Sequence, residues 1–435
     1  MQHLSPDYVY TPQGLQAHMV ISIAEDGRIA SISQQNLKAQ YLSPSEILPM
    51  PGITLLPGFV NAHSHVYQRA LRGHTHRPLS RHDTFWTWRN AMYAEAGKLN
   101  PELLYTSALV TFREMLAAGY TSVGEFHYVH HQSDGQPYAH PNEMAEAIIQ
   151  AWRGVGIRVV LLMTAYAQSG FNQPPEEMQQ RFCDASIDAY LDRVETLRLN
   201  GELIGVAPHS VRAVPEEWFR AIAGYSLTHK LPLHVHADEQ QAEVEQCLTM
   251  CGFRPIELLD RFGALSILTT IVHATHANEA EIGLLAQRGC TVCVCPTTEG
   301  DLGDGIAPYA ELLAAQIPLA IGSDSNTRLD PIEELRWAEY SARMRYQRRR
   351  ILIGDELASP GPLLLEYGTR RGANSLGIDA GAIAPGMLAD FIAVDMHHPS
   401  LAGWNSGDFL DTLFFGASAD IIAGTWVQGR QVYSR

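Results

Sequence analysis

One local pattern recurs along the chain: a short run rich in β-branched residues, then a turn, then an amphipathic stretch. The amphipathic stretches carry helix signals, as in NEAEIGLLAQRG, where Asn278 precedes the helix, Glu281 follows three residues later and Gly289 ends it. Another, PELLYTSALVTFREMLAAG, closes at Gly119. The eight candidate strands are residues 53–65, 121–127, 158–165, 203–210, 232–237, 268–275, 290–296 and 318–325. Strands that alternate with helices pair in parallel, which predicts an α/β fold.

Nearly every candidate strand starts apolar and ends in a residue capable of chemistry. These strand-end residues are His63, His65, Glu125, His127, His209, His236, His273 and Asp324. In a (β/α)8 barrel such ends converge on one face, where barrel enzymes keep their active sites, whereas an open sheet gathers only a few at its switch point. The pattern therefore favours a (β/α)8 TIM barrel.

Both ends of the chain differ from the middle, because they are glycine-rich and β-like and lack strand-end polar groups. We interpret residues 1–52 and 377–435 as two parts of one small flanking β-sandwich domain formed by both chain termini. Residues 53–376 then form the barrel.

The charge balance points to a small-molecule substrate. Lys and Arg number 31 against 47 Asp and Glu, a formal charge of −16, which argues against nucleic acid or an anionic membrane as partner. No apolar run approaches the roughly 20 residues of a membrane span, and MQHLSPDYVY lacks the features of a signal peptide, so we expect a cytoplasmic protein.

In CTVCVC, a thiolate cluster is one interpretation of Cys290, Cys293 and Cys295, but alternating small apolar residues in a β-run favour buried core thiols.

His63 and His65 stand two apart on a strand, so both side chains point to one face and can bind one ion. Alone the pair is weak evidence, because the same spacing occurs in surface and core histidines. His236 offers a third nitrogen and Asp324 an anionic oxygen, and three histidines with one carboxylate describe a catalytic zinc site with a position left for water.

Two further residues complete this constellation. Glu239, three residues after His236, lies where a carboxylate reaches over the ion without binding it, and His273 would lie beside the water. Each residue also has an ordinary structural interpretation: Asp324 as a helix N-cap, and the neighbouring His234 as a hydrogen-bonded core histidine. Chance placement of the whole set at strand ends is much less probable.

The motifs PGFVNAHSH, HxHxxE, VHATH and GSDS, with the C-terminal GIDAGAIAPGMLADFIAVD, resemble the amidohydrolase superfamily over essentially the whole chain. The resemblance implies a barrel with a flanking β-sandwich and one divalent metal ion per subunit, most often zinc. Its ligands would be His63, His65, His236 and Asp324. A homodimer is expected from the same resemblance.

Other segments are similar to the formimidoylglutamate deiminases of that superfamily: DTFWTWRNAMY, EFHYVHH, HSVRAV, HADEQQAEV, TTEGDLGDGI and IEELRWAEY. This implies hydrolytic deamination of N-formimino-L-glutamate to N-formyl-L-glutamate and ammonia, in histidine degradation. The implied catalytic residues are Glu239, His273 and Asp324. The implied substrate-binding residues are Gln68, Arg89, Tyr128, His209 and Arg212. Independently, a small anionic substrate needs cations, and the arginine fork matches a carboxylate with two bonds.

Other functions remain open. A related deaminase acting on a cyclic amidine such as guanine, a pterin or an adenosine derivative, or on another formimino-amino acid, shares the metal core. A catalytically silent metal-binding or scaffold protein is a third reading. The family's pattern has SDSH and a histidine where this chain has Asn326 and Gln168, and Arg328 follows where a less polar residue is expected. These differences bear on the substrate more than on the reaction.

Three further features receive structural interpretations. Trp86 and Trp88 are predicted to pack rather than to recognise substrate, and residues 348–350 to lie on a solvated helix face or a subunit contact.

Overall fold

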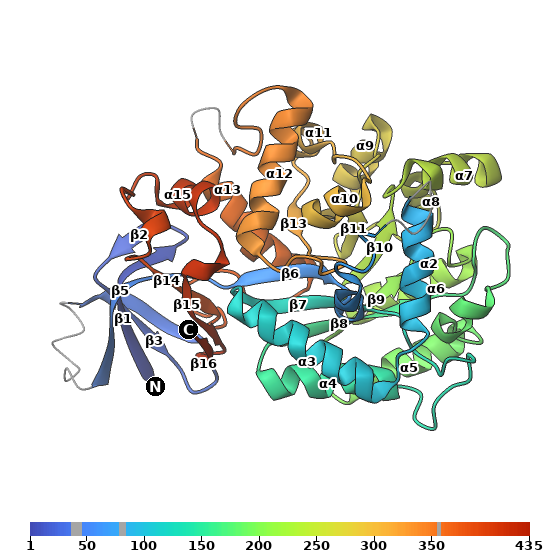
Figure 1. The fold of residues 1–435 in the computed structure, drawn as a ribbon, viewed down its shortest axis with the longest axis horizontal. Coiled ribbons are helices and arrows are strands. Elements are labelled where there is room, and N and C mark those ends of the chain that lie inside the picture. The colour runs from blue at the N-terminus through green and yellow to red at the C-terminus, as the bar shows by residue number, and fades with distance from the viewer. Residues whose placement is uncertain (36–45, 78–83, 355–357) are drawn as a thin grey trace.

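The computed structural model describes residues 1–35, 46–77, 84–354 and 358–435. One of its two sheets contains eight parallel strands in consecutive order, one for each predicted strand (Figure 1). These are β6 (Phe59–Ser64), β7 (Tyr120–His127), β8 (Arg158–Ala165), β9 (Ile204–Pro208), β10 (Leu233–Ala237), β11 (Thr269–His273), β12 (Thr291–Val294) and β13 (Leu319–Ile321). The predicted (β/α)8 TIM barrel is confirmed.

The barrel closes between its first strand and the segment after its last one. Ser64 and Asp324 form an isolated parallel bridge. The Asp324 amide donates to the His63 carbonyl over 3.0 Å, and the His65 amide donates to the Asp324 carbonyl over 2.9 Å. Closure of the sheet therefore brings the two histidines of β6 beside Asp324.

Helices surround this sheet (Figure 1). The longer ones are α2 (Phe85–Ala96), α3 (Pro101–Ala117), α4 (Glu143–Val155), α5 (Ile187–Leu199), α6 (Glu216–His229), α7 (Gln241–Cys251), α9 (Glu279–Arg288), α12 (Pro331–Tyr346) and α15 (Phe409–Gly416). The shorter ones are η2 (Val66–Leu71), η3 (Glu177–Phe182), α8 (Pro255–Arg261), α10 (Pro296–Leu302), α11 (Tyr309–Ala314), α13 (Gly361–Glu366), η4 (Tyr367–Arg371), α14 (Gly372–Ser375), η5 (Pro399–Leu401) and η6 (Ala419–Ile421).

The predicted helix signals work as expected in α9. The Asn278 side chain accepts a hydrogen bond from the Glu281 amide over 3.0 Å. Gly289 ends the helix in the left-handed conformation, which glycine adopts without a Cβ penalty. The helix that begins at Pro101 ends at Ala117, and Gly119 follows it with a φ of 92°.

Both chain termini build the second sheet, where the N and C termini lie in Figure 1. Its strand order is β16-β15-β14-β5-β1-β3-β4, with β2 paired to β1. The bounds are β1 (Gln2–Thr11), β2 (Gly14–Ala17), β3 (Met19–Ile23), β4 (Ile29–Gln34), β5 (Ile47–Pro57), β14 (Phe391–Asp395), β15 (Ile422–Val427) and β16 (Arg430–Ser434). A core of its own, separate from that of the barrel, includes Leu4, Ile21, Leu55, Phe391 and Trp426. The predicted flanking β-sandwich is confirmed.

The strand predicted over residues 53–65 is two strands. Residues 53–57 end β5 and pair with β14 in the terminal sheet, and β6 starts only at Phe59. Gly58 separates them, and a Cβ there would lie 2.2 Å from the Thr121 side chain, so glycine allows that side chain to pack directly against the Gly58 backbone. The terminal sheet therefore extends to Pro57, past the boundary predicted at residue 52, while the domain division itself stays a prediction.

Two smaller predictions have clear outcomes. Cys293 and Cys295 lie in a fully buried cluster with Ala62, Val272 and Ala320, which confirms the core interpretation of the CTVCVC run. Residues 348–350 are predicted on a solvated helix face or in a subunit contact, and the helix part of this prediction is wrong, because α12 ends at Tyr346 and its cap Gln347 turns into the left-handed conformation. Those arginines therefore follow the helix as exposed residues. Among the described helices, none has the length and apolar character needed to cross a membrane.

Candidate active site

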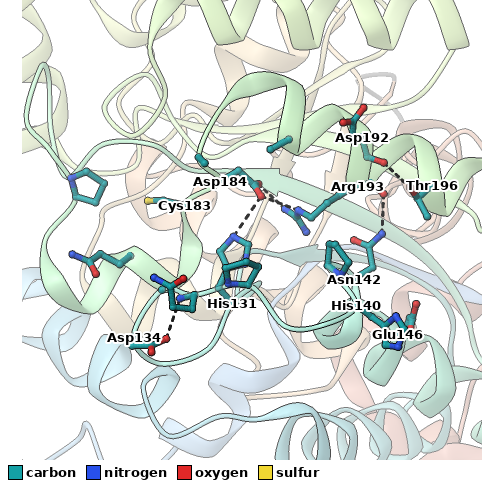
Figure 2. A pocket seen from close by; sticks show the side chains of 18 residues that line it. His131, Asp134, His140, Asn142, Glu146, Cys183, Asp184, Asp192, Arg193 and Thr196 are labelled. Carbon is teal, nitrogen blue, oxygen red and sulfur yellow. Dashed lines mark hydrogen bonds and ion pairs between the residues drawn. The ribbon is translucent and has the colours of Figure 1, made fainter.

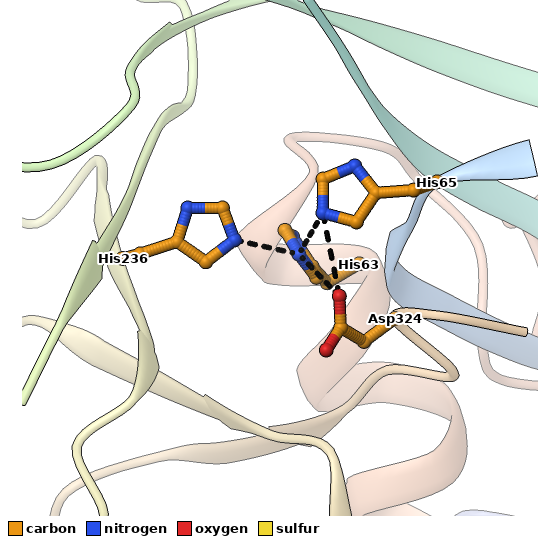
Figure 3. Close-up of side chains that lie close together, drawn as sticks. All are labelled: His63, His65, His236 and Asp324. Atoms are coloured by element: carbon orange, nitrogen blue, oxygen red, sulfur yellow. Dashed lines mark hydrogen bonds and ion pairs between the residues drawn. The ribbon is translucent and has the colours of Figure 1, made fainter. Parts of the chain in front are cut away.

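Four predicted ligands meet at the strand-end face of the barrel (Figure 3). The Nε2 atom of His63 lies 3.2 Å from that of His65 and 3.1 Å from that of His236. Asp324 Oδ1 lies 3.4 Å from His63 Nε2 and 3.3 Å from His65 Nε2. All four side chains are buried, so their ligand atoms face one another and not solvent.

The donor set fits a metal ion. His65 Nδ1 is 2.9 Å from the Phe126 carbonyl and His236 Nδ1 is 3.1 Å from the His209 carbonyl. These acceptors place the ring protons on Nδ1, so the Nε2 lone pairs point at one another and need a cation between them. Tetrahedral zinc with bonds of about 2.0–2.1 Å separates its ligand atoms by about 3.3–3.4 Å, close to the distances here.

The protonation states also suit metal binding. Burial lowers the pKa of His63 to about 3, against the opposing effect of Asp324, and burial lowers the pKa of His236 as well. Burial alone would raise the pKa of Asp324, but the contacts with His63 and His65 hold it well below its usual range. Neutral imidazole and ionised carboxylate are the forms that bind metals.

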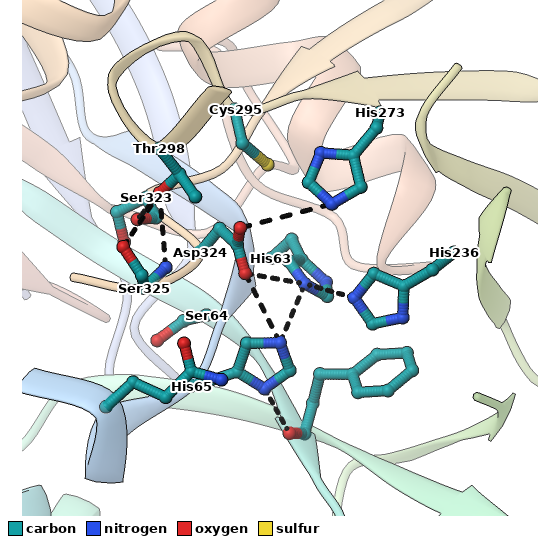
Figure 4. Close-up of polar contacts among 12 residues, drawn as sticks. His63, Ser64, His65, His236, His273, Cys295, Thr298, Ser323, Asp324 and Ser325 are labelled. Carbon is teal, nitrogen blue, oxygen red and sulfur yellow. Dashed lines mark hydrogen bonds and ion pairs between the residues drawn. The ribbon is translucent and has the colours of Figure 1, made fainter. Parts of the chain in front are cut away.

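Glu239 and His273 lie together beside this cluster. His273 Nε2 is 3.7 Å from Glu239 Oε1. The same atom is 4.0 Å from Asp324 Oδ2 (Figure 4). Burial raises the pKa of Glu239 to about 7, His273 opposes this rise and Asp324 adds to it. A carboxyl group with such a pKa can both hold and release a proton at neutral pH. His273 and Asp324 have positive φ values of 74° and 45°, which is backbone strain typical of functional sites.

A second group of possible ligand atoms adjoins the first. His273, Cys295 and Asp324 have ligand atoms within 4.8 Å of one another (Figure 4). This group shares Asp324 with the first and supplies only three atoms. Burial raises the pKa of Cys295 well above its usual value, which keeps it a thiol in the core cluster. The four-residue cluster is therefore the candidate metal centre.

A narrow cavity of about 50 Å³ opens next to the metal centre. All five predicted substrate-binding side chains line it: Gln68, Arg89, Tyr128, His209 and Arg212. Several of their buried polar atoms have no hydrogen-bond partner within the described parts of the chain, namely Gln68 Oε1, Arg89 Nε, and Arg212 Nε and Nη1. Burial works against the charge of Arg212, but Glu243 and Tyr166 raise its pKa, so the guanidinium stays charged.

Helix α2 supplies a wall of this cavity that the sequence did not reveal. Phe85, Trp88, Met92 and Tyr93 line it together with Arg89. The Arg89 guanidinium lies 4.6 Å from the centre of the Trp86 ring, so Trp86 supports a predicted binding residue instead of packing alone. The helical spacing of residues 85, 88, 89 and 92 places them on one face, and that spacing was the available signal.

The positions that depart from the family's pattern lie outside this cavity wall. Asn326 is fully buried and donates to Ser64 Oγ over 3.1 Å and to the His65 carbonyl over 2.8 Å, so it supports the seam between β6 and β13. Arg328 pairs with Glu333 near the surface. The Gln168 amide donates to the Ala213 carbonyl over 3.0 Å.

A larger cavity of about 710 Å³ lies between α4, α5 and the segment after β7 (Figure 2). It contains none of the predicted site residues. Its buried Arg193 is already paired with Asp184 through two hydrogen bonds of 2.9 and 2.7 Å. His131 Nε2 lies 3.4 Å from the same carboxylate.

Fold and site together define a barrel hydrolase with a candidate metal centre, and comparison with known proteins gives the family. The model of the amidohydrolase family matches residues 54–432, so the chain belongs to that family, whose deaminase relatives are hydrolases acting on C–N bonds.

Two curated relatives span nearly the whole chain. Formimidoylglutamate deiminase of Pseudomonas aeruginosa is 37% identical over 428 residues, covering 96% of this chain and 92% of the relative. 8-Oxoguanine deaminase of the same species is 31% identical, covering 97% and 92%. The crystal structure of an amidohydrolase from Brucella melitensis superposes with a TM-score of 0.90 at 32% identity, covering 100% of this chain and 96% of that one.

Proposed function

We propose that this chain hydrolyses N-formimino-L-glutamate to N-formyl-L-glutamate and ammonia, a reaction of histidine degradation. One observation carries the proposal: Arg89 and Arg212 line the cavity beside the metal centre, and neither has an ion pair with a described carboxylate. Unpaired charge is costly at the buried Arg212, and the half-buried Arg89 has a buried Nε atom without a partner, so the two guanidinium groups fit a substrate that brings its own carboxylates. The similarity to formimidoylglutamate deiminase supports the same substrate.

His63, His65, His236 and Asp324 would hold one divalent ion, and the nitrogen-rich donor set favours zinc. Such an ion would supply a hydroxide nucleophile near neutral pH and would polarise the amidine.

The chain's own residues handle the protons. His273 accepts a proton from the attacking water, with Asp324 Oδ2 4.0 Å from its Nε2 atom. Glu239 donates a proton to the imino nitrogen, so that nitrogen leaves as ammonia and not as an amide anion. One water is consumed, the C–N bond to the imino nitrogen breaks, and a formyl C=O bond replaces it. Gln68 and Tyr128, joined by a 3.2 Å hydrogen bond, help Arg212 hold the carboxylates.

A cyclic amidine is the second candidate substrate. Phe85 and Trp88 line the cavity and would stack on a ring, and 8-oxoguanine deaminase is among the relatives. A neutral ring, however, leaves both guanidinium groups unpaired. The dianionic substrate is therefore the better match.

A cytoplasmic homodimer remains the expected state of the protein.

A coupled ammonia assay over a substrate panel tests this proposal. The panel holds N-formimino-L-glutamate, N-formimino-L-aspartate, guanine, a pterin and adenosine, with zinc-loaded enzyme. We expect kcat/KM for formiminoglutamate to exceed that for every ring substrate by at least about a hundredfold, the effect of about 3 kcal/mol from the charged contacts. Ammonia release from a ring but not from formiminoglutamate would overturn the proposal. Comparable rates with formimino-aspartate would keep the reaction and change the substrate.

A further inference from the structure

We propose that Glu299 is a positioning residue that orients His273 for proton transfer. Glu299 belongs to the TTEGDLGDGI segment, whose role the metal ligands and substrate contacts leave unexplained. The proposal rests on the proposed hydrolytic deamination, but not on which amidine is the substrate.

The two ring nitrogens of His273 face different partners. Nδ1 lies 3.3 Å from Glu299 Oε1, whereas Nε2 faces Glu239 at 3.7 Å and Asp324 at 4.0 Å. Glu299 is only 3% exposed, so solvent does not compete for this contact. The Glu299 carboxylate therefore contacts the side of the ring that is turned away from the reacting atoms.

The Glu299 carboxylate is held independently of His273. Its Oε1 atom also accepts a hydrogen bond from the Cys295 amide over 2.8 Å. The Glu299 amide in turn donates to the Cys295 carbonyl over 2.9 Å, in the first turn of α10. A carboxylate held by the backbone at the start of a helix can therefore orient the His273 ring that contacts it.

The contact between Glu299 and His273 Nδ1 suits a histidine that acts in proton transfer, because it fixes the tautomer and stabilises the charged ring. A carboxylate acceptor keeps the proton on Nδ1 and leaves the Nε2 lone pair free to accept the proton of the attacking water. The same negative charge stabilises the imidazolium that then forms, as the orienting acid does in hydrolytic triads.

Glu334 provides a matched control. It is a second fully buried glutamate that accepts hydrogen bonds from the same helix, from the amide of Thr297 over 3.0 Å and from its hydroxyl. Its described hydrogen bonds go to Thr297, not to His273. E334Q therefore perturbs the support of α10 without touching the proton-transfer pair.

Steady-state kinetics of zinc-loaded E299Q, E299L and E334Q, on the best substrate of the panel, test the proposal. E299Q keeps an acceptor but loses the charge, so we expect kcat to fall about tenfold or more. E299L removes the acceptor, so we expect a fall of about a hundredfold or more, within the range of general acid–base catalysis. KM and zinc content should stay near wild type for both, and E334Q should keep kcat within about twofold.

Wild-type kcat in E299L would overturn the proposal, and so would an equal loss in E299Q and E334Q, which would show a general disturbance of α10. A rise in KM alone would place Glu299 in substrate binding and would also overturn it. Failure of formiminoglutamate as substrate leaves this comparison intact, because it uses whichever amidine is turned over.

A readout without turnover complements the kinetics. In zinc-loaded protein labelled with ¹⁵N-histidine, with H273N used for assignment, we expect wild-type and E334Q His273 to carry a proton on Nδ1, and E299L to lose that preference. An unchanged Nδ1 signal in E299L would overturn the proposal.

Discussion

The arginines that line the two cavities differ in whether the protein supplies them with a partner. In the larger cavity, Arg193 is paired with Asp184 through two short hydrogen bonds, so its charge is balanced within the protein. In the cavity beside the metal centre, Arg89 and Arg212 have buried donor atoms without partners in the described residues. We therefore interpret Arg193 as an arginine that stabilises the fold, and Arg89 and Arg212 as arginines that bind an anionic ligand. All three belong to segments around the barrel.

The largest effect is expected at the metal centre. Asp324→Asn removes the only anionic ligand of the four, so the variant should fold, bind zinc poorly and lose activity by about a thousandfold or more. Zinc analysis and the ammonia assay on the same preparation check this. Wild-type-like turnover in a metal-replete preparation would remove Asp324 from the site.

Proton delivery comes next in size. Glu239→Gln should keep zinc and substrate affinity but lose the general acid, a loss of about 10² to 10⁴ in kcat. Zinc content measured beside kcat separates this effect from metal loss. If turnover is retained, another group must protonate the leaving nitrogen.

The variant Arg212→Ala tests whether the unpaired arginine beside the metal centre binds the substrate. Removing one partner of a buried charged contact costs about 2 to 5 kcal/mol, so kcat/KM for formiminoglutamate should fall at least about tenfold. Slow turnover of a small uncharged amidine should change far less. An equal loss for both substrates would mean that Arg212 supports the structure, as Arg193 does.

The smallest effect on activity is expected in the larger cavity. Asp184→Asn leaves Arg193 unpaired and should destabilise the fold by about 3 to 5 kcal/mol, while kcat/KM of the folded enzyme stays within about twofold. Urea unfolding and kinetics of the same variant check both parts. A large rise in KM would contradict the separation between the two cavities.

The same variant has an expected pH dependence. Burial opposes ionisation of Asp184, but Arg193 and His131 hold its pKa below the usual aspartate value. A depressed pKa contributes stability above the unfolded value, and that stability is lost as the pH falls through the folded value. The stability difference between wild type and Asp184→Asn should therefore stay constant from about pH 5 to 8 and shrink only below about pH 4. A difference that changes steadily over the neutral range would contradict the pairing.

Much of the barrel and its site could be predicted from the sequence because the ends of the strands have a recognisable residue pattern. A β-branched run that ends in a polar residue, as at His236 or His273, marks both the strand and the face on which it opens. The break at Gly58 could not be predicted, because residues 53–62 are largely apolar throughout and the change of sheet depends on the pairing of residues 53–57 with the distant β14. The ring contact between Trp86 and Arg89 likewise depends on geometry, since the sequence alone leaves tryptophan packing as the simpler interpretation.

A cycle that combines the substrate's carboxylates with Arg212 tests the central claim most directly. It compares N-formimino-L-glutamate with the two analogues that lack one carboxylate each, in wild type and in Arg212→Ala. If Arg212 binds a carboxylate, the variant should lose at least about tenfold in kcat/KM with the dianion and almost nothing with one of the two analogues. An equal loss with all three substrates would contradict the account, because Arg212 would then not contact either carboxylate.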